Sequence, residues 1–138
     1  MPVPDFLDTN VLVYAYDASD KRKQGIAREL VRRAVAGEMV VSTQVLGEFC
    51  ATLLHKLSPS PQHKQVATIL EALSPIKVVS TDGDMVRRAV DVNGTYKLHF
   101  YDGMIVAAAE RAGSTTIWSE DLNPGQEYFG IRVQDPFA

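Results

Sequence analysis

Apolar residues occur in two patterns along the chain: short continuous runs, and longer stretches in which they recur every three or four positions. The short runs predict buried β-strands, and the longer stretches predict helices with one apolar face. We expect strands at residues 3–7, 39–42, 76–79 and 115–118, with a short fifth at 131–133. Helices are expected at residues 8–16, 21–36, 43–57, 62–74, 82–92 and 102–112. Residues 93–100 are expected to form a loop.

This alternation of strands and helices predicts an α/β fold. Because the strands are apolar throughout, the sheet should be parallel and covered by helices on both faces. The expected architecture is a three-layer sandwich with a central parallel sheet of four or five short strands. The length of 138 residues suits a single domain over residues 1–138, and the chain contains no repeat, linker or low-complexity segment.

Composition bears mainly on the setting of the protein. Cys50 is the single cysteine, so an internal disulfide framework is excluded and a reducing, cytoplasmic setting is expected. The chain begins without a signal-like segment, and its apolar runs are too short to span a bilayer. The net charge of −3 argues against a protein that binds nucleic acid mainly through a strongly basic surface. An enzyme whose acidic pocket binds a cation remains compatible with this charge.

Four acidic residues stand out by their positions: Asp8, Glu48, Asp102 and Asp121. Asp8 directly follows the first predicted strand and Asp121 closely follows the fourth, so both should lie at the edge where parallel strands end. Asp102 opens a helix and shares its apolar stripe. Glu48 lies beside the core-facing stripe of its helix, where a carboxylate without a partner is costly.

Carboxylates gathered without cysteine or histidine suit a hard cation such as Mg²⁺ or Mn²⁺. Such an ion is typical of sites that carry out phosphate chemistry. Each acid also has an ordinary structural explanation: a helix N-cap for Asp8 and Asp102, a turn for Asp121, and an ion pair with Arg87 or Arg111 for Glu48. The residues alone therefore indicate a metal site without excluding these explanations.

Four segments, FLDTNVLVYA, QVLGEF, YDGMIVAAAERAG and IWSEDL, resemble in their order the motifs of PIN-domain ribonucleases. The resemblance spans nearly the whole chain and is closest to the VapC-type toxins of prokaryotic toxin–antitoxin pairs. It implies a PIN-like fold and a hydrolase that uses Mg²⁺ or Mn²⁺ to cut RNA phosphodiester bonds. It also implies an antitoxin protein as partner and a homodimer.

The resemblance assigns both catalysis and metal binding to Asp8, Glu48, Asp102 and Asp121. Thr9, Asn10 and Ser119 match positions that orient the ligands or the substrate. Water is the nucleophile in such a mechanism, so neither a catalytic histidine nor the ribose 2′-OH is required.

The chain departs from the family pattern at two places. Asn123 occupies a position where the family has a further acid, and Glu120, beside Asp121, is a candidate substitute. Gly103 follows Asp102 where another small residue is more common, and a glycine there is expected to loosen the first turn of the helix.

Two other functions compete with the ribonuclease. A phosphatase of the haloacid-dehalogenase type also begins with an acid after its first strand, but it needs a second acid where this chain has Asn10. A non-catalytic PIN-like domain would bind only a partner protein. For an antitoxin, the expected apolar docking patch is Val11, Leu12 and the helix at 26–30, whereas Lys97, His99 and a tyrosine at 96 or 101 are candidates for RNA contacts.

Overall fold

The computed structural model describes residues 3–138. Its strands are β1 (Asp5–Leu7), β2 (Met39–Ser42), β3 (Lys77–Val79), β4 (Thr116–Trp118), β5 (Glu127–Tyr128) and β6 (Ile131–Gln134). Its helices are α1 (Thr9–Tyr16), α2 (Lys21–Val35), α3 (Thr43–His55), α4 (His63–Leu73), α5 (Gly83–Tyr96) and α6 (Phe100–Arg111). None of these helices is both long and apolar enough to cross a lipid bilayer.

The strands form one sheet in the order β3-β2-β1-β4-β6-β5. The pairs β3–β2, β2–β1, β1–β4 and β4–β6 are parallel, and β5 runs antiparallel to β6. The predicted parallel α/β sheet is therefore confirmed. The two-residue strand β5 was not predicted, because a strand of that length carries no periodic pattern. The strand order reverses between β1 and β4, which is the place where open α/β sheets form ligand sites.

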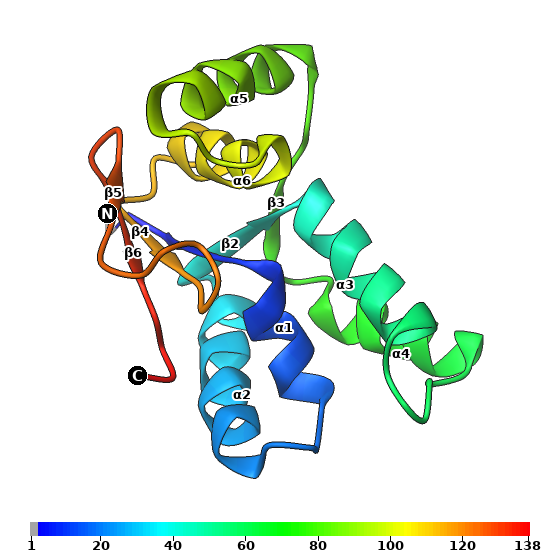
Figure 1. Cartoon of the computed structure of the whole chain (residues 1–138). Coiled ribbons are helices and arrows are strands. Elements are labelled where there is room, and N and C mark those ends of the chain that lie inside the picture. The colour runs from blue at the N-terminus through cyan, green and yellow to red at the C-terminus, as the bar shows by residue number, and fades with distance from the viewer. Residues whose placement is uncertain (1–2) are drawn as a thin grey trace.

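Helices cover both faces of the sheet, as Figure 1 shows. Helices α5 and α6 lie above the strands in this view, and α1 and α2 lie below them. Helices α3 and α4 lie to the right, at the β2–β3 side of the sheet. The arrangement is the three-layer sandwich that the strand and helix pattern predicts.

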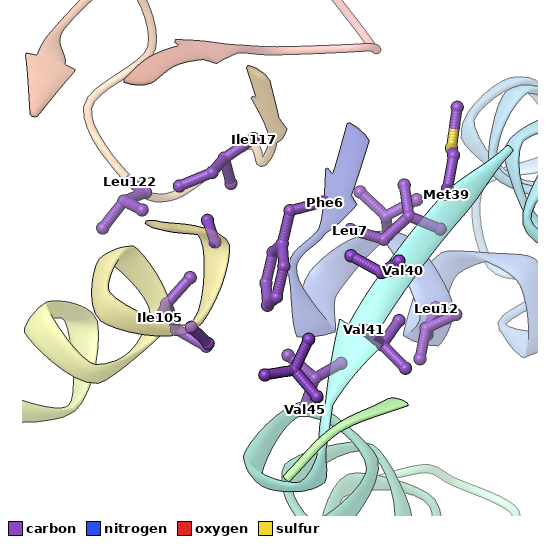
Figure 2. Close-up of a cluster of buried hydrophobic side chains, with 14 of the residues drawn as sticks. Phe6, Leu7, Leu12, Met39, Val40, Val41, Val45, Ile105, Ile117 and Leu122 are labelled. Atoms are coloured by element: carbon purple, nitrogen blue, oxygen red, sulfur yellow. The ribbon is translucent and has the colours of Figure 1, made fainter. Parts of the chain in front are cut away.

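The core consists of apolar side chains from both faces of the sheet (Figure 2). Phe6 is in register with Val40 on one side and with Ile117 on the other, so these three side chains share one face. They gather there with Ile105 of α6, whereas Leu12 of α1 lies on the other side. Complete burial of such strands on both faces explains why they read as continuous apolar runs.

The apolar patch expected to face an antitoxin is not a surface. Val11 and Leu12 are fully buried, and Leu30 of α2 is 7% exposed. These side chains belong to the hydrophobic core that joins α1 and α2 to the sheet. The prediction of an exposed docking patch at these residues is therefore wrong, because the same apolar spacing serves internal packing.

The connection between α5 and α6 is shorter than predicted. Helix α5 continues to Tyr96 instead of ending near residue 92, and α6 begins at Phe100. Asn93 and Gly94, which read as turn residues in the sequence, lie inside the last turns of α5. The helix ends at Lys97, which adopts a left-handed backbone conformation (φ 61°) and donates its N–H to the carbonyl of Asn93. Packing against α6 outweighs the weak helix propensity of these residues.

Candidate active site

The four predicted acids line one cavity of about 640 Å³ at the carboxyl ends of β1 and β4. Asp8 comes from the end of β1, Glu48 from α3, Asp102 from the first turn of α6, and Asp121 from the loop after β4. Thr9 and Asn10 line the same cavity. Residues separated by more than 100 positions in the sequence thus meet where the strand order reverses.

Asp8 is the most buried of the four acids, with 8% of its surface exposed. It is the N-cap of α1, because its Oδ1 accepts the N–H of Thr9 at 2.7 Å. Its Oδ2 accepts the hydroxyl of Ser119 at 2.8 Å. Burial raises the pKa of Asp8 to about 6, although both hydrogen bonds act in the opposite direction. The charges of Glu48 and Asp102 raise this pKa further, so the three carboxylates repel one another.

Ser119 is fully buried and ties the loop after β4 to α1. Besides donating to Asp8, its Oγ accepts the Nδ2–H of Asn10 and the backbone N–H groups of Asp121 and Leu122, each at 3.2 Å. Asn10 completes the connection, because its Oδ1 accepts the N–H of Glu120 at 3.1 Å. Both side chains hold the loop in place. The position where a phosphatase needs its second acid is therefore taken by Asn10, whose amide has a structural role in holding this loop.

Glu48 is joined to the end of β1 by a hydrogen bond from the hydroxyl of Thr9 to its Oε1 at 2.8 Å. The suggested ion pairs are not formed with this residue, since Arg87 pairs with Asp84 and Arg111 with Asp82. Glu48 is exposed to the cavity on the outer side of α3. Its position follows from Ser42, whose side chain caps the start of that helix directly after β2.

Asp102 lies in the first turn of α6 and is not the helix cap, because the side chain of His99 has that role. Burial raises the pKa of Asp102, the nearby His99 lowers it, and the charges of Glu48 and Asp121 raise it again. The pKa of Asp121 is also raised, first by burial and then by the charge of Glu120. All four acids therefore lie within electrostatic reach of at least one other.

Gly103 has a packing role instead of loosening the helix. A Cβ atom at this position would come within 2.9 Å of the carbonyl oxygen of Ala89 in α5. Absence of the side chain lets α5 and α6 approach closely, and this contact fixes the start of α6 beside the cavity. The expectation of a loosened first turn is wrong, since residues 100–111 form a continuous helix.

The donors of the cavity fit a hard divalent cation in their chemistry. The cavity presents carboxylate, hydroxyl and amide oxygens, and these are the ligands that such ions prefer. Within residues 3–138, no three acidic, histidine or cysteine side chains are close enough, as they stand, to hold one ion together. Glu48, Asp102 and Asp121 are exposed, so their side chains have room to rotate toward the buried Asp8. The chemistry of these donors fits a cation, but the carboxylates are farther apart than the ligands of a single bound ion would be.

Asn123, which occupies the position of the family's further acid, and Glu120, the candidate substitute, lie in different environments. Glu120 lines the cavity, but it accepts the hydroxyl of Tyr14 at 2.7 Å and pairs with Lys23. Burial favours its neutral form, yet the bonds from Lys23 and Tyr14 outweigh this and lower its pKa. Asn123 adopts a left-handed turn conformation (φ 50°), and its amide donates to the hydroxyl of Tyr128. Glu120 is already neutralised, and Asn123 contributes to the turn.

Some cavity residues were absent from the prediction. Tyr14 is one of them, and its hydroxyl donates to Glu120 in the cavity. Thr52 and Lys56 line the wall formed by α3. Their spacing of four and eight residues from Glu48 is helical, so projection of α3 onto a helical wheel would have placed them beside that acid.

A family model described as the PIN domain matches residues 6–125. The chain belongs to the PIN-domain family. Comparison with curated protein sequences gives no match. The matched range includes Asp8, Glu48, Asp102 and Asp121, and the resemblance inferred from the four sequence segments is confirmed.

Solved structures share the fold of this PIN domain at low sequence identity. The sarcin–ricin loop cleaving toxin VapC20 of Mycobacterium tuberculosis is 19% identical, with a TM-score of 0.66 over 93% of this chain and 98% of that chain. A toxin–antitoxin complex from Klebsiella pneumoniae is 18% identical, with a TM-score of 0.66 over 96% and 97%. VapBC2 from Rickettsia felis, bound to a fragment of its promoter DNA, is 15% identical, with a TM-score of 0.66 over 95% and 97%.

Proposed function

We propose that this PIN domain is an endoribonuclease that hydrolyses RNA phosphodiester bonds with the help of Mg²⁺ or Mn²⁺. The observation that carries the proposal is that Asp8, Glu48, Asp102 and Asp121 line one cavity, in which burial raises the pKa of Asp8 to about 6. Mutually repelling acids in one cavity are costly unless a cation neutralises them. The family and the toxin structures that share the fold support an RNA substrate.

The roles of the residues follow from their surroundings. Asp8 and Asp102 would hold the cation, with Glu48 and Asp121 binding it directly or through water. A bound divalent cation supplies Lewis-acid polarisation of a phosphate oxygen and favours ionisation of water. Ser119 keeps Asp8 in one orientation, and Thr9 keeps Glu48 turned toward the end of β1. These bonds lower the conformational freedom that the ligands would lose when the ion binds.

The same proposal includes the partners and the setting. We assign the protein to the toxin half of a toxin–antitoxin pair that acts in the cytoplasm, with an antitoxin protein and a second copy of the chain as partners. The complexes from Klebsiella pneumoniae and Rickettsia felis support the antitoxin, because their chains share this fold over almost their full length. Co-expression with the product of the adjacent gene should block the toxicity and the RNA cleavage.

Cleavage of RNA by the purified protein tests the activity. We expect cleavage of total RNA with Mg²⁺ or Mn²⁺, none with excess chelator, and loss of most cleavage in Asp8→Asn. Asp91→Asn is a matched control, because Asp91 is an exposed acid on α5 outside the cavity. Equal cleavage by the wild-type and Asp8→Asn proteins would point to a contaminant and remove the assignment. Release of phosphate from small phosphoesters without RNA cleavage would favour the phosphatase.

A further inference from the structure

Helix α3 forms one wall of the acidic cavity, and different kinds of side chain lie at its two ends. Near its start, Gln44 donates from its amide to the carbonyl of Tyr101 at 3.1 Å, which places Tyr101 beside that end. Glu48 lies further along the helix, and Lys56 directly follows the last residue of the helix, His55. From Gln44 to Lys56 the distance along a helix is about 18 Å. A linear ligand lying along α3 would pass Tyr101, Glu48 and Lys56 in turn.

Lys56 is the one lysine or arginine among the described residues that line the cavity. It is exposed, and within residues 3–138 it forms no ion pair, in contrast to Lys23, which is held by Glu120. An ammonium group without a partner beside several carboxylates suits a ligand that brings its own negative charge. A phosphate of a nucleic-acid backbone fits this description.

Tyr101 provides an aromatic surface at the other end of the wall. Its side chain is 56% exposed although it is large and apolar. It stacks on the imidazole of His99, with ring centroids 5.8 Å apart and planes inclined by 24°. The bond from Gln44 fixes its backbone, and Asp102 follows it directly. Tyr96 does not offer a similar surface, because it packs against Tyr128 and its hydroxyl accepts the N–H of Phe129.

We infer that a single-stranded RNA segment lies along α3, with one base stacked on Tyr101 and a backbone phosphate bound by Lys56, so that the intervening phosphate reaches the four acids. This inference rests on the proposed ribonuclease function. An aromatic ring with an accessible face binds an unstacked base, which a single strand provides and a duplex does not. The acidic cavity also disfavours the denser charge of a duplex.

Direct binding tests the path separately from catalysis. The Asp8→Asn protein would be titrated, with Mg²⁺ present, against a fluorescently labelled ten-nucleotide RNA, and binding followed by fluorescence anisotropy. Tyr101→Ser added to this protein should weaken binding about tenfold, because stacking on one base is lost. Tyr101→Phe should bind within about twofold of the parent, since the ring is retained. A hairpin duplex of the same composition should bind at least about tenfold more weakly.

Lysine variants test the other end of the path. Lys56→Gln should weaken RNA binding and reduce the slope of log affinity against log salt concentration by about one. Lys77→Gln is the matched control, because Lys77 is an exposed lysine on β3 outside the cavity, and it should bind like the parent. Thermal melting of each variant checks that it is folded.

The outcomes separate this inference from the proposed function. If the wild type cuts RNA while Tyr101→Ser and Lys56→Gln bind RNA like the parent, the path along α3 is wrong and the ribonuclease stands. If the protein neither binds nor cuts RNA, both fall. Equal binding of the duplex, or an equal loss in Tyr101→Phe, would overturn single-strand stacking. Variants that keep RNA binding but lose a protein partner would make this surface a protein interface.

Discussion

Replacing Asp8 with asparagine should stabilise the cation-free protein at neutral pH, although the same change removes a proposed metal ligand. The reason is that burial raises the pKa of this carboxyl from 3.8 to about 6. A group whose pKa is higher in the folded state contributes stability that is fully present below its ordinary pKa and is lost as the pH rises through the higher value. The wild type should therefore lose stability as the pH rises from about 4 to about 6, and its stability should stay at this lower level above about pH 6.

The size of the effect follows from the pKa change. A pKa change of one corresponds to a free energy of about 1.4 kcal/mol, so full ionisation of Asp8 lowers the free energy of unfolding by about 3 kcal/mol. Little of this is screened by solvent, because the side chain is 8% exposed. Asparagine avoids the charge, but its single oxygen can accept only one of the bonds from Thr9 and Ser119, and the loss of one costs about 1 kcal/mol. The net gain expected for Asp8→Asn is about 1–2 kcal/mol above pH 7.

Thermal melting of both proteins at several pH values measures this difference. With excess chelator, Asp8→Asn should melt several degrees above the wild type at pH 7.5, and the two curves should cross on acidification because the asparagine has lost a hydrogen bond. Addition of Mg²⁺ at pH 7.5 should raise the melting temperature of the wild type and have little effect on Asp8→Asn. An equal concentration of charge supplied as NaCl controls for ionic strength.

A difference between the two proteins that stays the same from pH 5 to pH 7.5 would refute the reasoning. It would mean that the Asp8 carboxylate is not destabilised by its surroundings in the folded protein. Stabilisation of both proteins by Mg²⁺ to the same extent would show that the ion binds elsewhere. The other acids are present in both proteins, so their contributions to the pH dependence of stability largely cancel. The pH dependence of the stability difference between the two proteins therefore reports on Asp8.

Three further changes test other parts of the site. Ser119→Ala should shift the acidic limb of cleavage to higher pH, because the serine hydroxyl lowers the pKa of the buried acid; an unshifted pH profile would contradict this. Gly103→Ala should lower stability by about 1–3 kcal/mol, since its Cβ meets a carbonyl of α5, whereas Gly94→Ala, which meets no atom, should be neutral or stabilising in thermal melts. Glu120→Gln should cleave RNA nearly as well as the wild type while Glu48→Gln loses most activity; the reverse order would reassign the ligands.

Strand ends were sufficient to predict that Asp8 and Asp121 line the same cavity, but not that Asp17 lines it too. Asp8 and Asp121 follow β1 and β4, and parallel strands place their carboxyl ends at one edge. The prediction needed only the directions of the strands, which short apolar runs separated by helices imply. The order of the strands, and hence the reversal between β1 and β4, depends on long-range pairing that local patterns do not contain.

Contacts between distant side chains were the part that the sequence could not supply. Lys23 and Glu120 pair across the fold, and nothing near either residue in the sequence indicates the other. The packing of α5 on α6 similarly decided the conformation of residues 93–100, where local propensity favoured a loop. Gly103 gained its role from the same contact, because the carbonyl that excludes a side chain there belongs to Ala89 on α5.

The two kinds of acid in the cavity explain why it is suited to a cation and not merely acidic. Glu120 has a lysine and a tyrosine hydroxyl as partners, and its pKa is lowered. Asp8 and Asp102 have raised pKa values, and within residues 3–138 neither forms an ion pair or a hydrogen bond with a lysine or arginine. A fold that neutralises one acid and leaves its neighbours repelling one another preserves the negative potential where α1, α3 and α6 meet. That potential costs stability in the free protein, and a bound cation would offset it while supplying the charge that a phosphate substrate needs.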